Sequence, residues 1–128
     1  MVTQARFEQG LTLEQYVAQM TVNKERFVRA LGQVALPPGA SAVLARLGDP
    51  RRVLVITEDW CGTSLAYIPF VAKLAEHGGL DLRIFLRDRN ADLMDQYLKH
   101  GRHRSIPVFA FFDANMTELA RFIEQAPS

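Results

Sequence analysis

The sequence predicts an α/β fold in which a mixed four-stranded sheet is flanked by helices and preceded by an N-terminal helical extension. From residue 51 onward the elements read strand, helix, strand, helix, strand, strand. A strand–helix–strand unit followed by a hairpin builds a mixed sheet, and its helices pack on that sheet. Residues 1–50 carry helical patterns and too few apolar residues for a core of their own. We therefore expect residues 1–50 to pack on the domain formed by residues 51–128, as one structural unit.

The composition is that of one ordinary globular domain. The 128 residues are 48% apolar and 23% charged, close to globular averages. The 15 basic and 14 acidic residues leave a net charge of +1, which provides no electrostatic basis for nucleic acid or a membrane as a partner. No apolar run approaches the roughly 20 residues that span a bilayer, so we expect a cytoplasmic protein. The single cysteine excludes an intramolecular disulfide and a multi-thiolate zinc site. Nicotinamide and flavin motifs are missing too, so we expect neither a metal nor a cofactor.

Three helices are expected in the N-terminal extension. A capping box at 12–15 and the apolar stripe that follows it predict a helix over 13–20. A second stripe over 27–34 ends at a Pro-Pro-Gly stop. A third, short helix over 40–47 ends at a Gly-Asp-Pro turn.

Four short apolar runs bounded by turn residues predict the strands of the sheet domain. These runs cover 52–57, 82–86, 107–112 and 117–123. The helix after the first strand runs to about residue 76 and ends at a Gly-Gly pair. Asn90 is a candidate cap for the helix after the second strand, and the apolar residues of that helix are Leu93, Met94, Tyr97 and Leu98.

Cys61 lies where the first strand ends and a helix begins. The first backbone N–H groups of a helix have no partner within it, so a thiolate at this point is stabilised and becomes a nucleophile. Ser64 follows one turn later, and its hydroxyl could donate a hydrogen bond to the sulfur. The alternative is that a lone cysteine is a small buried apolar residue. The flanking Trp60 and Gly62 and the strand–turn–helix context favour an exposed functional thiol.

Several motifs, in order and at the right spacing, resemble those of the thioredoxin family. Trp60-Cys61-Gly62-Thr63-Ser64 is similar to the family's Trp-Cys-Gly-X-Cys site, and Pro69 matches the proline of the active-site helix. Ser105-Ile106-Pro107 resembles the turn that carries the family's cis-proline, and the hairpin at 113–118 falls where the family's does. The resemblance covers about residues 51–123. It implies a thioredoxin-like fold with a cis bond before Pro107. It also implies a substrate site formed beside Cys61 by Trp60, Gly62, Thr63, Ile106 and Pro107.

Three departures from the family pattern also bear on the function and on the fold. Ser64 replaces the second cysteine, so a mixed disulfide on Cys61 must be resolved by an external thiol. Val55 and Ile84 stand where many thioredoxins carry a buried acid and a lysine. The family's last helix would follow Ile123, so we expect it to be missing before Ser128. The N-terminal helices or a second subunit would then cover that face of the sheet.

These observations favour a monothiol, thioredoxin-like thiol–disulfide exchange protein. Cys61 would attack the sulfur, Ser64 would support the thiolate or merely fill the resolving position, and Ile106-Pro107 would dock the substrate backbone. The partners would be protein thiols and disulfides or glutathione. The main alternative is a non-catalytic, thioredoxin-like binding module. A third hypothesis is a redox sensor in which Cys61 is oxidised or links two subunits. Under this hypothesis the protein could form a homodimer.

The remaining residues near the expected site have either a structural or a functional interpretation. Arg102, His103 and Arg104 precede the proline turn and could bind a carboxylate near the thiol, although a solvated basic loop is the preferred interpretation. Residues 87–89 are interpreted as a charged turn. Glu58 and Asp59 are expected to have surface roles, while Trp60 is equally well explained as a substrate contact or a packing residue.

Overall fold

The computed structural model describes residues 1–124 and confirms the expected α/β architecture. Its sheet has the strand order β2-β1-β3-β4. The strands are β1 (Arg52–Thr57), β2 (Asp81–Leu86), β3 (Val108–Phe112) and β4 (Glu118–Ile123). β1 pairs with β2 in parallel, whereas β1–β3 and β3–β4 pair antiparallel, so the sheet is mixed as predicted.

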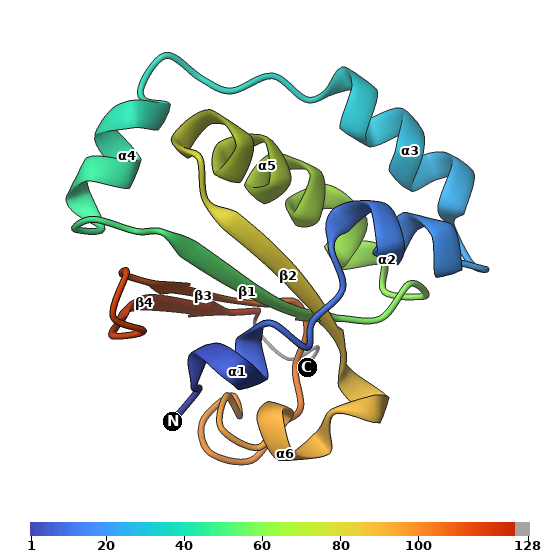
Figure 1. The fold of residues 1–128 in the computed structure, drawn as a ribbon. Coiled ribbons are helices and arrows are strands. Elements are labelled where there is room, and N and C mark those ends of the chain that lie inside the picture. Colours follow the sequence, from blue (N-terminus) through green and yellow to red (C-terminus); the bar gives the residue numbers. More distant parts are fainter. Residues whose placement is uncertain (125–128) are drawn as a thin grey trace.

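Helices lie on both faces of this sheet (Figure 1). One face carries α2 (Leu13–Gln19), α3 (Lys24–Gln33), α4 (Ala40–Arg46) and the long α5 (Gly62–Gly78). The other face carries α1 (Gln4–Phe7), the 3₁₀ helix η1 (Arg87–Arg89) and α6 (Ala91–Met94). Among the described residues, no helix is both long and apolar enough to cross a bilayer.

β1 is buried on both sides because its side chains alternate between two cores. Leu54 and Ile56 belong to the core beneath α1 and α6, while Val53 and Val55 belong to the core beneath α5. All four side chains have no exposed surface. A strand buried on both faces reads as a continuous apolar run, which is the pattern that the sequence shows.

The N-terminal helices contribute to both cores. Phe7 of α1 belongs to the core beneath α6. Tyr16 of α2 belongs to the core beneath α5, where its ring packs edge-on against the ring of Phe27 of α3, with 5.6 Å between the ring centroids. Leu11 forms an isolated antiparallel bridge with Ile84 of β2. The first 50 residues are therefore in direct contact with the sheet and with α5, mainly through α3.

Most helix signals act as expected. The capping box of α2 forms with both reciprocal hydrogen bonds, and α5 ends at Gly79, whose φ of 69° suits glycine. Helix α1 was not expected, and Thr3 caps it. Asn90 stands at the start of α6 without capping it. Its Oδ1 accepts a hydrogen bond from the Arg6 guanidinium at 2.9 Å, and its side-chain amide donates to the Leu86 carbonyl at 2.7 Å.

Helix α6 is shorter than the sequence predicts. It ends at Met94, so Tyr97 and Leu98 lie beyond it, although Tyr97 remains buried. The chain turns instead through His100 and Gly101, both with positive φ, where Lys99 and His103 exchange backbone hydrogen bonds. The expected absence of the family's final helix concerns the residues after Ile123, and residues 125–128 lie outside the described part of the chain.

Candidate functional site

Cys61 is the N-cap residue of α5, directly after the turn that leaves β1. Its side chain is partly buried, and the thiol donates a long hydrogen bond to the Ile106 carbonyl, with Sγ···O at 3.9 Å. The bond between Ile106 and Pro107 is cis, as the family resemblance implies. The fold thus brings the thiol and the proline turn together although 45 residues separate Cys61 from Ile106 in the chain.

The thiol faces a surface hollow of about 380 Å³, here called the thiol hollow. Trp60, Cys61 and Thr63 line it at the start of α5, and Arg87 lines it after β2. Residues 102–106 and Glu124 complete its wall. The expected substrate contacts Trp60, Thr63 and Ile106 therefore share one hollow with Cys61. Gly62 is exposed in the first turn of α5, and Pro107 lines a neighbouring groove instead.

The Ser64 hydroxyl is hydrogen-bonded to the last residue of β1 and not to the thiol. Ser64 is 3% exposed, and its hydroxyl pairs with the Thr57 hydroxyl at 2.6 Å. Within residues 1–124, no hydrogen bond joins Ser64 to the sulfur. The hydrogen bond from the Ser64 hydroxyl to Cys61, which the sequence left open, therefore does not form in this structure. A buried hydroxyl needs a partner, and Thr57 at the end of β1 supplies it.

Tyr16 is a polar residue near the site that sequence reasoning did not single out. Its ring is buried in the α5-side core, and its hydroxyl lies close to the Thr57 side chain. Burial is the main cause that raises the pKa of Tyr16 to about 12, and the Asp59 carboxylate adds to the effect. The nearby strands carry an apolar pair, since Val55 and Ile84 are direct neighbours in register and fully buried.

Arg87 is a second residue whose place the sequence did not predict. It follows β2, which runs parallel to β1, so the ends of both strands meet at the edge of the sheet that carries Cys61. Its guanidinium lies over the Trp60 ring at 5.0 Å and donates to the Arg104 carbonyl at 3.1 Å. Strand direction was the signal that could have placed it.

The basic residues before the proline turn are exposed and also line the thiol hollow. Arg102, His103 and Arg104 each have an open side chain. Arg104 pairs with Asp95 at 3.1 Å. This loop is therefore both exposed to solvent and part of the wall of the hollow that contains Cys61.

Asp59 connects the N-terminal helices to the turn before the thiol. Its carboxylate accepts the backbone N–H groups of Thr21 at 2.9 Å and Val22 at 3.2 Å. The Asn23 amide donates to the Asp59 carbonyl at 3.0 Å. Glu58 accepts the backbone N–H of Asp88 at 2.9 Å. Both acids thus hold loops together around the site.

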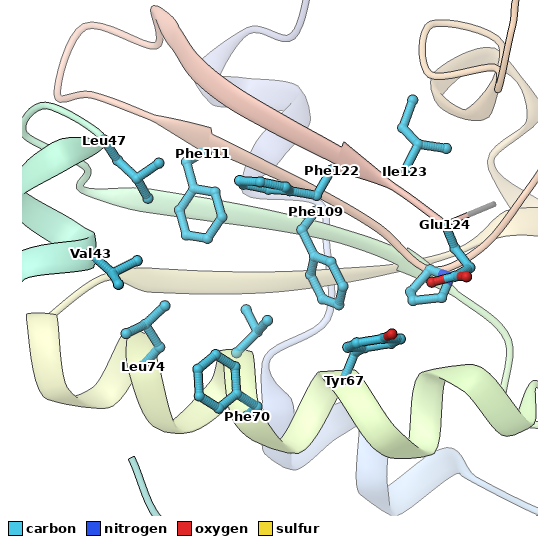
Figure 2. Close-up of a pocket in the computed structure, with 12 residues that line it drawn as sticks. Val43, Leu47, Tyr67, Phe70, Leu74, Phe109, Phe111, Phe122, Ile123 and Glu124 are labelled. Carbon is cyan, nitrogen blue, oxygen red and sulfur yellow. The ribbon is translucent and has the colours of Figure 1, made fainter. Parts of the chain in front are cut away.

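A second hollow of about 360 Å³ lies between α4, α5 and the β3–β4 hairpin, here called the apolar groove. Figure 2 shows Tyr67, Phe70 and Leu74 of α5 facing the aromatic side chains of the two strands. Phe122 remains 53% exposed and Tyr67 48% exposed. Glu124 lines both the groove and the thiol hollow, so the two regions adjoin.

No group of three or more potential metal-ligating side chains is present in the part of the chain that the structure describes. The side chains that line the thiol hollow include one thiol, three guanidinium groups, an imidazole, a carboxylate and an indole.

Comparisons with known proteins agree with this geometry. A family model described as thioredoxin matches residues 10–128, so the chain belongs to the thioredoxin family. A search of curated proteins finds no match.

Two solved structures are similar to this one. The crystal structure of a protein of unknown function from Pseudomonas aeruginosa is 22% identical, with a TM-score of 0.78 over 98% of this chain and 78% of that one. An HIV epitope-scaffold is also 22% identical, with a TM-score of 0.79 over 97% of this chain and 78% of that one. At this identity the two structures establish a shared fold alone.

Proposed function

We propose that the protein is a monothiol thioredoxin-like exchange protein in which Cys61 forms mixed disulfides that an external thiol resolves. The observation that carries the proposal is the place of the Cys61 sulfur, at the start of α5, beside Ile106 and lining an open hollow. A sulfur at the positive end of a helix and next to open space can reach a disulfide from solution.

The chemistry follows from a single cysteine. Cys61 loses its proton to solvent, and the thiolate attacks one sulfur of a disulfide. The old S–S bond breaks, one half leaves as a thiolate, and Cys61 becomes half of a new mixed disulfide. Ser64 stands one turn later where the family has its second thiol, so a separate thiol must attack this mixed disulfide and restore Cys61.

The wild-type protein and the Cys61→Ser variant, treated with oxidised glutathione and measured by intact mass, test the proposal. We expect one glutathione adduct on the wild-type protein only, and we expect reduced thiol to remove it. Equal circular dichroism spectra of the two proteins would show that both are folded. If native wild-type protein forms no adduct, while its thiol reacts normally after unfolding in urea, the proposal fails.

A non-catalytic binding module is the second candidate, and one feature favours it. Val55 and Ile84 form a buried apolar pair where many thioredoxins carry an acid and a lysine. If the Cys61→Ser variant keeps every partner of the wild-type protein, and those complexes survive reductant, recognition is independent of the thiol and this second function is favoured.

A further inference from the structure

The thiol hollow carries an excess of positive charge on its wall. Arg87, Arg102 and Arg104 line it, and Glu124 is the one carboxylate among the lining residues. His103 lies among them as a further nitrogen donor. The three guanidinium groups come from two separate segments, the turn after β2 and the loop before Pro107, and converge on the hollow that contains Cys61.

Two of the three arginines have acidic partners outside the hollow. Arg87 pairs with Asp88 at 3.0 Å and Arg104 pairs with Asp95 at 3.1 Å, but neither aspartate lines the hollow. The Arg104 pair is about half exposed on both sides. Such pairs are weak in water, and each guanidinium keeps further N–H groups for a second acceptor.

Arg102 is the least neutralised of the three. Within residues 1–124, no carboxylate oxygen lies within 4.0 Å of its side chain. It is also exposed, so its charge reaches the hollow without a competing ion pair.

Arg87 is already held in position. Its side chain is 20% exposed, rests over the Trp60 ring and donates to the Arg104 carbonyl. A cation fixed in this way loses little conformational freedom when it binds an anion, which favours binding.

We propose that the thiol hollow selects disulfides that carry carboxylates close to the sulfur, with Arg87, Arg102 and Arg104 holding the carboxylates while Cys61 attacks. This inference rests on the proposed function, because it names the substrate class of the same thiol. Guanidinium groups bind carboxylates through paired, charge-assisted hydrogen bonds. Glutathione and an acidic polypeptide both present this chemistry.

The covalent step is the exchange described above, and the substrate disulfide is the oxidant. One substrate sulfur joins Cys61, the other leaves as the thiolate of the acidic fragment, and the proton of Cys61 passes to solvent. The arginines take no part in the bond changes and act by placing the anion.

Three small disulfides of different charge test the inference on the intact protein. They are oxidised glutathione (anionic), bis(2-hydroxyethyl) disulfide (neutral) and cystamine (cationic). Second-order rates of adduct formation on Cys61 are divided by the rates of 2-mercaptoethanol with the same disulfides, which removes their intrinsic reactivity. We expect the normalised rate to be about 3–10-fold higher for the anionic than for the neutral disulfide, and lower for the cationic one. The preference should weaken as salt is added.

Matched variants locate the effect. Arg102→Gln together with Arg104→Gln should abolish most of the anionic preference, measured as the ratio of the normalised rates for the anionic and the neutral disulfide. Arg26→Gln together with Arg46→Gln removes two exposed charges from α3 and α4, which do not line the hollow, and should change none of the ratios. Arg87 is left intact because it also contacts Trp60.

The outcomes separate the two proposals. If Cys61 reacts with all three disulfides at equal normalised rates, or if both double variants behave alike, charge selection is wrong and the exchange function stands. If Cys61 reacts with none of them, the exchange function fails and the selection falls with it. A glutamate-flanked cysteine peptide, offered as its disulfide, completes the test: a faster reaction than with oxidised glutathione assigns the carboxylates to a polypeptide, and a slower one assigns them to the small molecule.

Discussion

The thiol hollow and the apolar groove adjoin at Glu124 but are built from different parts of the molecule. Loop ends and the first turn of α5 form the hollow, with charged side chains around one sulfur. The faces of α5, α4 and the β3–β4 hairpin form the groove, with aromatic and aliphatic side chains. The sheet and helices give the loops a fixed support, and the loops carry the chemistry.

The two regions should govern different properties of the protein, namely stability and thiol reactivity. Phe109 and Phe111 are 7% and 3% exposed, so they belong to the core as much as to the groove. Trp60 is 51% exposed in the hollow. Substitutions at the buried side of the groove should therefore lower the free energy of unfolding, whereas substitutions at the hollow should alter the reactivity of Cys61.

The largest expected effect on stability is at the buried side of the groove. Phe111→Ala removes a buried ring and leaves a cavity, so we expect the free energy of unfolding to fall by about 3–5 kcal/mol. Trp60→Ala is the matched aromatic substitution in the hollow and should cost less than about 1 kcal/mol. Urea denaturation of both variants measures the contrast. Equal losses would show that the hollow is part of the core and would end the distinction.

The next effect concerns the layer behind the thiol and depends on pH. Burial raises the pKa of Tyr16 to about 12 in the folded protein, with Asp59 as the second cause, against about 10 in the unfolded chain. Folding therefore favours the neutral phenol, and this contribution is fully present below pH 10 and lost as the pH rises from 10 to 12. Urea denaturation between pH 9 and 12 should show a smaller loss of stability for Tyr16→Phe than for wild type.

Burial also raises the pKa of Tyr97. Its contribution remains in both proteins and cancels from the comparison. Identical pH profiles for wild type and Tyr16→Phe would contradict the assignment of the shift to Tyr16.

A smaller effect tests the connection between the N-terminal helices and the hollow. Asp59→Ala removes the carboxylate that accepts the N–H groups of Thr21 and Val22, so we expect a loss of about 1–2 kcal/mol in the free energy of unfolding. Asp49→Ala is the control, because the Asp49–Arg51 pair is exposed and should contribute no more than about 0.5 kcal/mol. Similar values for the two variants would mean that Asp59 does not fasten the α2–α3 connection.

The smallest effect concerns the rim of the groove. Phe122→Ser removes a half-exposed ring, so stability should change by no more than about 1 kcal/mol while the groove loses apolar surface. We expect weaker fluorescence of bound anilinonaphthalene sulfonate than for wild type. Val28→Ser, at an exposed valine of α3 outside the groove, should leave the fluorescence unchanged. A reduced signal in both variants would place the dye elsewhere.

Much of the site could be anticipated from local sequence. The place of Cys61 at the start of a helix follows from a strand pattern, a turn and a helical stripe, which are all properties of neighbouring residues. The Ile106-Pro107 turn carries a recognisable motif. The position of Arg87 was missed because it depends on β2 lying parallel to β1. The hydrogen bond between the Ser64 and Thr57 hydroxyl groups was missed because it depends on how the side chains pack between β1 and α5.

Local sequence patterns were enough to predict the succession of strands and helices along the chain, the mixed sheet and the single thiol at a helix start, because apolar periodicity and turn residues act over short distances along the chain. Three features became visible only in the folded chain: two arginine-bearing segments line the hollow that contains Cys61, Tyr16 lies close to Thr57, and an apolar groove adjoins the hollow. These contacts join residues that are far apart in sequence, and their geometry comes from how the elements pack and not from the pattern of any one of them.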